Sequence, residues 1–147
     1  MEISSDLREL LVILNRYGVE YAVCGGHAVA FYGYPRMTMD MDLLVLPDDE
    51  NADRLMKALK EFGFGDAGIP RNAFLEEGTA VTLGVQPNQV DIITSMSRAS
   101  TKGIIARSTP GKLAGVSVRY VCREDLIEAK RQAGRAKDAA DLEELGG

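Results

Sequence analysis

Apolar residues recur at helical spacing in several segments of the chain, and these segments predict helices. The predicted helices span residues 5–17, 50–62, 124–134 and 138–145. In the first of them, leucines repeat three and four positions apart, and Gly18 ends the pattern. A further short helix is expected directly after Gly25 and Gly26.

Short apolar or alternating runs separate these helices and predict β-strands. The predicted strands span residues 20–24, 39–46, 80–85, 89–93 and 112–122. Pro87 and Asn88 mark a turn between two of them, and residues 95–110 are polar without a clear pattern. The order of elements predicts a mixed β-sheet with helices packed against it, in the α/β (α+β) class. No repeat or linker divides the chain, so we expect a single domain over residues 1–147.

Composition narrows the classes of function. The chain has 147 residues, a net charge of −5 and an isoelectric point near 4.9, so a diffuse electrostatic grip on nucleic acid is not expected. No run approaches 18 apolar residues, and the N-terminal residues lack the layout of a signal peptide. Two distant cysteines and one histidine exclude a Cys/His zinc site. We therefore expect a reduced, cytoplasmic protein with no membrane partner.

Two aspartates, Asp40 and Asp42, stand two positions apart at the start of a predicted strand. Side chains alternate along a strand, so these carboxylates share one face while Met39 and Met41 point to the other. Two like charges this close repel each other, and a divalent cation between them removes the conflict. Carboxylate oxygens favour Mg²⁺, although a pair of acids at an exposed strand end is the plainer interpretation of the motif alone.

The neighbouring sequence adds two features. Asp91 interrupts the apolar strand QVDII, where a lone charge is costly unless it is paired or bound to a metal. Gly25 and Gly26 stand between a strand and a helix, where a tight turn exposes backbone N–H groups that suit a phosphate. Three carboxylates on adjacent strands beside such a turn predict a site.

These motifs, in this order, resemble the nucleotidyltransferase superfamily with the DNA polymerase β-like (palm) fold, in its minimal single-domain form. The likeness runs from about residue 20 to the end of the chain and is firm over residues 24–46 and 130–142 and loose between them. It is carried by CGGHAVAFYGYPRMTMDMDLLV, which contains Asp40 and Asp42, and by VDII around Asp91. The spacing Arg36-x-Thr38-x-Asp40-x-Asp42 and the tail KRQAGRAKDAADLEEL, residues 130–145, resemble a bacterial branch that includes abortive-infection toxins.

The resemblance implies transfer of an NMP from an NTP such as ATP to a hydroxyl acceptor, within a toxin–antitoxin or abortive-infection system. Asp40 and Asp42 would ligate Mg²⁺ carrying the triphosphate, and Gly25 and Gly26 would cradle its phosphates. Asp91 would ligate a second Mg²⁺ and help to deprotonate the acceptor. The acceptor is open between a small molecule, an RNA end and a protein hydroxyl. A second copy of the chain or a cognate protein is an open partner.

Basic residues near the C-terminus suggest further contacts. Lys130 lies on the apolar stripe of its predicted helix, where an ammonium group wants an anion, either an active-site Asp or a polyphosphate. A lysine stem that carries its ammonium into water is the alternative. Arg135 and Lys137 could face phosphate or pair with Asp138 and Asp141.

Arg36 and Thr38 precede the carboxylates in a turn, where they either hold phosphate or only stabilise the turn. His27 follows the glycines and is more simply a partly buried histidine than a substrate contact.

Two other enzyme classes fail on the sequence. The apolar run follows the Asp-x-Asp motif rather than preceding it, unlike a haloacid-dehalogenase-like phosphatase, and no Gly-x-Gly-x-x-Gly motif is present for dinucleotide binding. The main alternative is a catalytically inactive domain of the same fold that binds a nucleotide or a protein. Proximity of Asp91 to Asp40 and Asp42 discriminates between a shared site and three separate acids.

Overall fold

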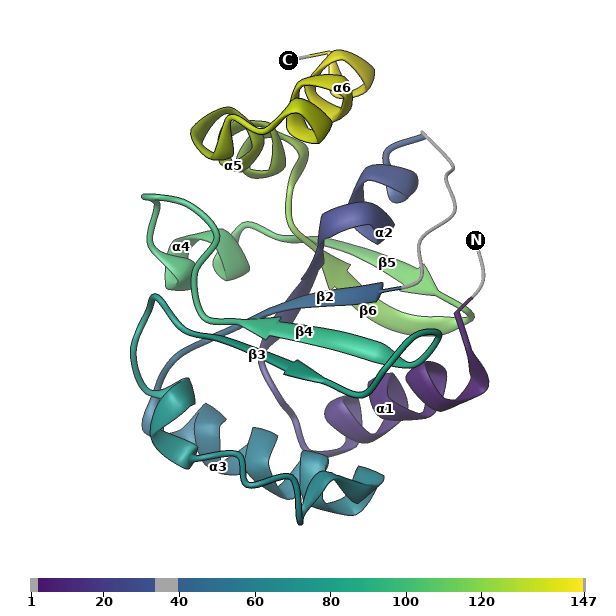
Figure 1. The fold of residues 1–147 in the computed structure, drawn as a ribbon, viewed down its shortest axis with the longest axis vertical. Coiled ribbons are helices and arrows are strands. Elements are labelled where there is room, and N and C mark those ends of the chain that lie inside the picture. The colour runs from purple at the N-terminus through teal and green to yellow at the C-terminus, as the bar shows by residue number, and fades with distance from the viewer. Residues whose placement is uncertain (1–2, 34–39, 147) are drawn as a thin grey trace.

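The computed structural model describes residues 3–33 and 40–146, apart from the side chain of Lys137. The elements in chain order are α1 (Ser5–Arg16), β1 (Tyr21–Cys24), α2 (Gly25–Phe31), β2 (Asp40–Val45), α3 (Asp49–Leu59), a π-helical turn (Lys60–Phe64), a 3₁₀ turn (Arg71–Phe74), β3 (Ala80–Leu83), β4 (Gln89–Ile93), α4 (Thr101–Ala106), β5 (Thr109–Leu113), β6 (Val116–Tyr120), α5 (Arg123–Ala133) and α6 (Ala136–Leu145). Figure 1 shows their arrangement.

The strands form one mixed sheet in the order β3-β4-β2-β1-β6-β5. Its centre combines the antiparallel pair β1–β2 with the parallel pairs β2–β4 and β1–β6. An antiparallel hairpin lies at each edge, β3–β4 on one side and β5–β6 on the other. The predicted mixed sheet with helices packed against it is confirmed.

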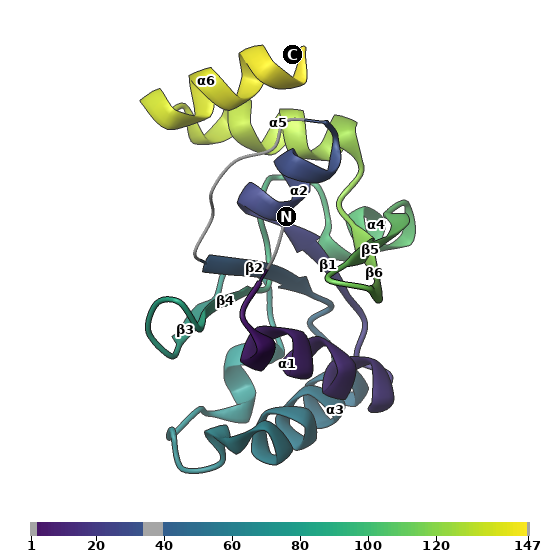
Figure 2. The ribbon, with the colours of Figure 1, turned by 90° about the vertical axis from the view of Figure 1, so that its right-hand side faces the viewer.

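Helices lie on both sides of the sheet, as Figures 1 and 2 show together. On one side are α1 and α3, and on the other are α2, α5 and α6. The leucine stripe of α1 is buried in the core, as its spacing predicted, and the Ser4 hydroxyl caps this helix by accepting from the Leu7 N–H at 3.2 Å. No described helix is long and apolar enough to cross a membrane.

The structure corrects the sequence prediction in two segments. Residues 112–122 do not form one strand, because Ala114 and Gly115 turn the chain back between β5 and β6. Both residues have positive φ, 51° and 80°, which is the backbone shape of a two-residue hairpin turn. In the unassigned stretch 95–110, Ser100 caps the short helix α4 by accepting from the Gly103 N–H at 3.1 Å, and β5 begins at Thr109.

Candidate functional site

A row of polar side chains crosses four adjacent strands of the sheet. Cys24 of β1 pairs in register with Asp42 of β2, Asp42 with Asp91 of β4, and Asp91 with Thr82 of β3. Residues paired in this way point to the same face, so their side chains stand side by side. The face is the one that carries α2, α5 and α6. The structure thus brings Asp91 next to Asp42.

Asp40 lies two residues before Asp42 in β2, so its side chain is on the same face as this row. It pairs in register with Gln89, and both Asp40 and Asp42 are half-buried. Met41, between them, is fully buried on the opposite face. The alternation expected from the sequence therefore holds, and the three predicted carboxylates occupy one patch of the sheet.

Neutral donors from the β3–β4 hairpin contact these carboxylates. The Thr82 hydroxyl donates to Asp91 Oδ1 at 2.7 Å, and Gln86 Nε2 donates to Asp40 Oδ1 at 3.0 Å. Gln89 Nε2 lies 3.3 Å from Asp40 Oδ2 and 3.4 Å from Asp91 Oδ1, so one amide group sits between two carboxylates. None of these three donors is expected from the sequence alone, because their contacts with the carboxylates depend on the register of the hairpin.

Gly25 makes the close approach of Asp42 possible. Its φ is +65°, and a Cβ at this position would lie 2.1 Å from Asp42 Oδ2. A side chain here would therefore both strain the backbone and collide with the carboxylate. Gly25 and Gly26 begin α2 directly after β1, as predicted, and both line the same cavity as the carboxylates.

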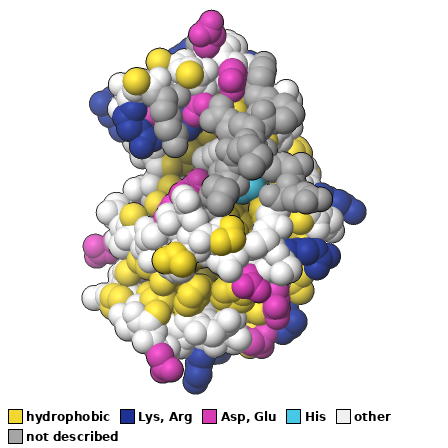
Figure 3. Space-filling model, turned by 45° about the vertical axis from the view of Figure 1, so that its right-hand side comes forward, with side chains coloured by type: hydrophobic (Ala, Val, Ile, Leu, Met, Phe, Trp, Pro, Cys, Tyr) yellow, Lys and Arg dark blue, Asp and Glu magenta, His cyan; other side chains and the backbone are white. Residues whose placement is uncertain are grey.

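This cavity has a volume of about 460 Å³ and lies between the sheet and the helices α5 and α6. Its sheet wall holds Asp40, Asp42 and Asp91, and its helical wall holds Lys130 with acidic and apolar residues. Figure 3 shows a hollow below the α5–α6 layer, with hydrophobic and acidic side chains inside it. Every described residue that the sequence nominated for the site lines this cavity.

Lys130 forms ion pairs with two aspartates of α6. Its Nζ lies 2.9 Å from Asp141 Oδ2 and 3.4 Å from Asp138 Oδ1, and the side chain is only 10% exposed. The alternative of an ammonium group carried into water is wrong. The partners are acids of the neighbouring helix, which the inward position of Lys130 alone did not identify.

Arg135 pairs with Asp138, the second of the two interpretations that its position left open. Its Nε lies 2.6 Å from Asp138 Oδ2, and this hydrogen bond is the main reason that the pKa of Asp138 lies below its usual value. Asp138 is itself fully buried. Arg36, Thr38 and the side chain of Lys137 lie outside the described residues.

Burial shifts the pKa values of two further groups near the site in the direction of their neutral forms. Burial raises the pKa of the Cys24 thiol far above its ordinary value, and the charge of Asp42 raises it further, so this cysteine is no thiolate nucleophile. Burial lowers the pKa of His27, which lines a separate small pocket with Phe31 and Tyr120. His27 is therefore a buried histidine that does not line the cavity of the carboxylates.

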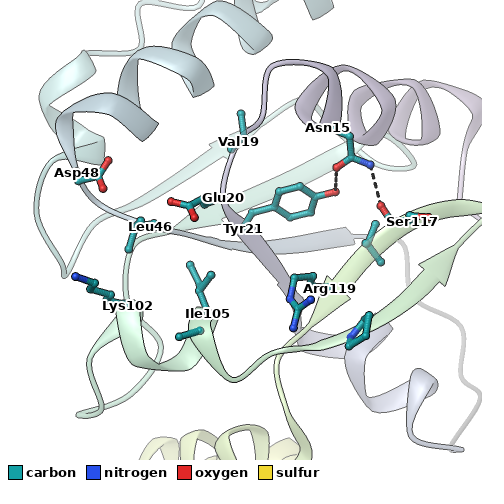
Figure 4. A pocket seen from close by; sticks show the side chains of 13 residues that line it. Asn15, Val19, Glu20, Tyr21, Leu46, Asp48, Lys102, Ile105, Ser117 and Arg119 are labelled. Atoms are coloured by element: carbon teal, nitrogen blue, oxygen red, sulfur yellow. Dashed lines mark hydrogen bonds between the residues drawn. The ribbon is translucent and has the colours of Figure 1, made fainter.

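A larger cavity of about 720 Å³ lies on the opposite side of the sheet, among α1, α4 and the β5–β6 hairpin. Figure 4 shows how its polar groups bond to one another. The Tyr21 hydroxyl donates to Asn15 Oδ1 at 2.9 Å, and the Asn15 amide donates to the Ser117 carbonyl at 2.8 Å. None of the sequence-nominated residues lines it.

Asp40, Asp42 and Asp91 are the acidic side chains on the sheet wall of this cavity. Within residues 3–33 and 40–146, no group of three or more Asp, Glu, Cys or His side chains is arranged to hold a metal ion. The Gln89 amide, which carries partial positive charge, contacts both Asp40 and Asp91. Carboxylate oxygens are the ligands that Mg²⁺ prefers, so these side chains would have to move closer together to share an ion.

Comparisons of structure place this arrangement among known folds. The chain is similar to an antigenic nucleotidyltransferase-like protein from Paracoccidioides brasiliensis, with a TM-score of 0.52 and 21% identity over 99% of this chain and 76% of that one. It is also similar to the lincomycin-bound lincosamide antibiotic adenylyltransferase LnuA, with a TM-score of 0.57 and 14% identity over 100% of this chain and 99% of that one.

No protein-family model matches the chain, and no curated protein sequence matches it significantly. The likeness to known proteins is therefore one of structure. The chain has the nucleotidyltransferase fold, as the motif around Asp40 and Asp42 predicted.

Proposed function

We propose that this protein is a Mg²⁺-dependent nucleotidyltransferase that moves an NMP from an NTP to a hydroxyl acceptor. The observation that carries the proposal is the adjacency of Asp42 and Asp91 in register, with Asp40 on the same face, in one cavity. The fold shared with an adenylyltransferase supports the same reaction class.

Asp40 and Asp42 would hold Mg²⁺ together with the triphosphate, and Asp91 would hold a second ion. Bound Mg²⁺ would supply Lewis-acid neutralisation of the charge that develops on the phosphate oxygens.

The remaining steps belong to residues of the chain. Asp91 accepts the proton of the acceptor hydroxyl, whose oxygen then forms a bond to the α-phosphorus. The bond from the α-phosphorus to the bridging oxygen breaks, and pyrophosphate leaves. Backbone N–H groups of Gly25 and Gly26 would contact the phosphates, and Lys130 would face them from α5. Arg36 and Thr38 are proposed as further phosphate contacts on the sequence pattern alone.

The acceptor stays open between a small molecule, an RNA end and a protein hydroxyl. The lincosamide antibiotic of the LnuA structure is a precedent for the first class. A role in abortive infection, with a cognate partner and a cytoplasmic location, remains a prediction from the sequence resemblance.

The test is incubation with each α-labelled NTP and Mg²⁺ in the presence of small-molecule, RNA and protein fractions. The proposal expects label to enter one fraction with the wild-type chain and not with Asp91→Asn. Binding of an NTP without transfer to any fraction would instead favour the catalytically inactive nucleotide-binding domain.

A further inference from the structure

Thr82 is the only residue of the in-register row that carries a hydroxyl, and it lies on the edge strand β3. Its Oγ1 donates to Asp91 Oδ1 at 2.7 Å, within the usual length of a hydroxyl–carboxylate hydrogen bond. The other described donor to Asp91, Gln89 Nε2, lies farther away, at 3.4 and 3.5 Å from the two oxygens. Thr82 therefore makes the shorter of these contacts with the third carboxylate.

The Thr82 hydroxyl restrains the orientation of the Asp91 carboxylate. Asp42 stands directly across from Asp91 on the neighbouring strand, and like charges in that arrangement repel. A hydrogen bond to one carboxylate oxygen opposes the rotation that this repulsion favours. Threonine is stiff at its first side-chain torsion, so its hydroxyl is a well-placed donor.

We propose that Thr82 is a positioning residue: it holds Asp91 by Oδ1 so that Oδ2 is available to the second cation and to the acceptor proton. This inference rests on the proposed function, because it assigns Asp91 the role given there. Partners of this kind, one step removed from the cation, typically change metal affinity about 10–100-fold when they are lost.

The experiment measures the affinity for Mn²⁺ by electron paramagnetic resonance, in the presence of the non-hydrolysable analogue α,β-methylene-ATP. Thr82→Val removes the hydroxyl with little change in shape, and we expect affinity to fall about tenfold. Thr82→Ser returns the hydroxyl and should recover affinity to within about twofold of the wild type, which a purely structural effect of the side chain would not produce.

A matched control is Thr79→Val, directly before β3 in the same hairpin. Side chains alternate along an extended chain, so Thr79 faces away from the carboxylates. We expect this variant to bind Mn²⁺ as the wild type does. Thermal unfolding of all variants checks that they fold, and Thr82 is exposed, so its replacement leaves the core intact.

Asp91→Asn distinguishes a failure of the Thr82 role from a failure of the proposed nucleotidyl transfer. If Asp91→Asn weakens Mn²⁺ binding and Thr82→Val does not, the positioning role is wrong and the proposed function stands. If Asp91→Asn binds Mn²⁺ as the wild type does, the proposed function itself fails. A Thr82→Ser variant as weak as Thr82→Val, or a Thr79→Val variant equally weakened, would also overturn the role of the Thr82 hydroxyl.

Discussion

Both walls of the cavity carry aspartates, but the partners of these carboxylates are cationic on the helical wall and neutral on the sheet wall. On the helical wall, Asp138 and Asp141 are buried and lie within ion-pair distance of the Lys130 ammonium, with Arg135 adding a second pair to Asp138. On the sheet wall, Asp40 and Asp91 accept from the amides of the hairpin and, at Asp91, from the Thr82 hydroxyl.

The difference has a physical meaning. A buried carboxylate needs a charged partner because its desolvation costs several kcal/mol, and the helical wall supplies that partner. The sheet carboxylates are only half-buried and stay in contact with solvent, so they can be held close together by weaker, neutral donors. The ion pairs of the helical wall therefore compensate buried charge, whereas we propose that the sheet wall binds a cation.

The largest expected effect is on the sheet wall. Asp42→Asn should lower nucleotidyl transfer about 10²–10³-fold, the cost of losing one group that stabilises transition-state charge. The fold should survive, because Asp42 is half-buried and the change removes a charge from a cluster of like charges. Transfer of label from an α-labelled NTP measures the loss, and thermal unfolding checks the fold. Full activity in this variant would remove Asp42 from the proposed site.

On the helical wall, replacement of the cation should act on stability. Lys130→Met should lower the free energy of unfolding by about 3 kcal/mol, at the low end for breaking a buried pair, because Arg135 continues to pair with Asp138. Chemical denaturation measures the change.

A control variant and a double variant show whether the loss of stability in Lys130→Met comes from the broken ion pairs. Lys57→Met, at an exposed lysine of α3, is the matched control and should change stability by less than about 0.5 kcal/mol. Adding Asp141→Asn to Lys130→Met should recover part of the loss, because the uncompensated charge is removed. If Lys130→Met were as stable as the control, the helical wall would not depend on its ion pairs.

A smaller effect is expected at Gly25, where a matched glycine is available. Gly18 and Gly25 have similar φ, +69° and +65°, but a Cβ at Gly18 meets nothing within 4 Å while one at Gly25 meets the Asp42 carboxylate. Gly18→Ala should therefore cost only the backbone strain, about 1 kcal/mol. Gly25→Ala should cost about 1–2 kcal/mol more, as for overpacking elsewhere, and should displace Asp42.

Chemical denaturation of both alanine variants measures the costs, and their affinity for Mn²⁺ reports on Asp42. Equal destabilisation with unchanged Mn²⁺ affinity would mean that the close approach of Asp42 to Gly25 has no role in the site.

The smallest expected effect is on the pH dependence of stability and comes from Asp138 on the helical wall. The pKa of Asp138 is lowered in the folded chain, chiefly by the hydrogen bond from Arg135. Its stabilising contribution is therefore present above the unfolded pKa of about 4 and is lost as the pH falls through the lower, folded value. Arg135→Gln should flatten this acid limb in denaturation curves measured below about pH 5. An unchanged limb would mean that another carboxylate governs it.

The sheet wall could be read from the sequence largely because its geometry is local. A period of two places Asp40 and Asp42 on one face, and an acid within an apolar strand marks Asp91. The glycine pair between a strand and a helix marks the turn beside them. These signals need no knowledge of distant contacts.

Contacts that depend on the pairing register of the strands could not be predicted from the sequence. A tight turn at Pro87-Asn88 would pair other residues, whereas the chain between β3 and β4 spans residues 84–88 and places Thr82 opposite Asp91. The same limit explains the missed hairpin at Ala114-Gly115, where a non-glycine residue adopts positive φ. Helical periodicity predicts that Lys130 faces inward. Its ion pairs with Asp138 and Asp141 depend on the packing of α6 against α5, which the sequence does not show.

Thermal unfolding with each of the four NTPs, with and without Mg²⁺, tests most directly whether the sheet wall binds a cation with a nucleotide. An NTP at 100 times its Kd should add about 2.7 kcal/mol, which raises the midpoint by several degrees for a domain of this size. We expect a rise that requires both the NTP and Mg²⁺ and that is lost in Asp42→Asn. A midpoint that no NTP raises, or a rise that is the same without Mg²⁺ or in Asp42→Asn, would contradict the assignment.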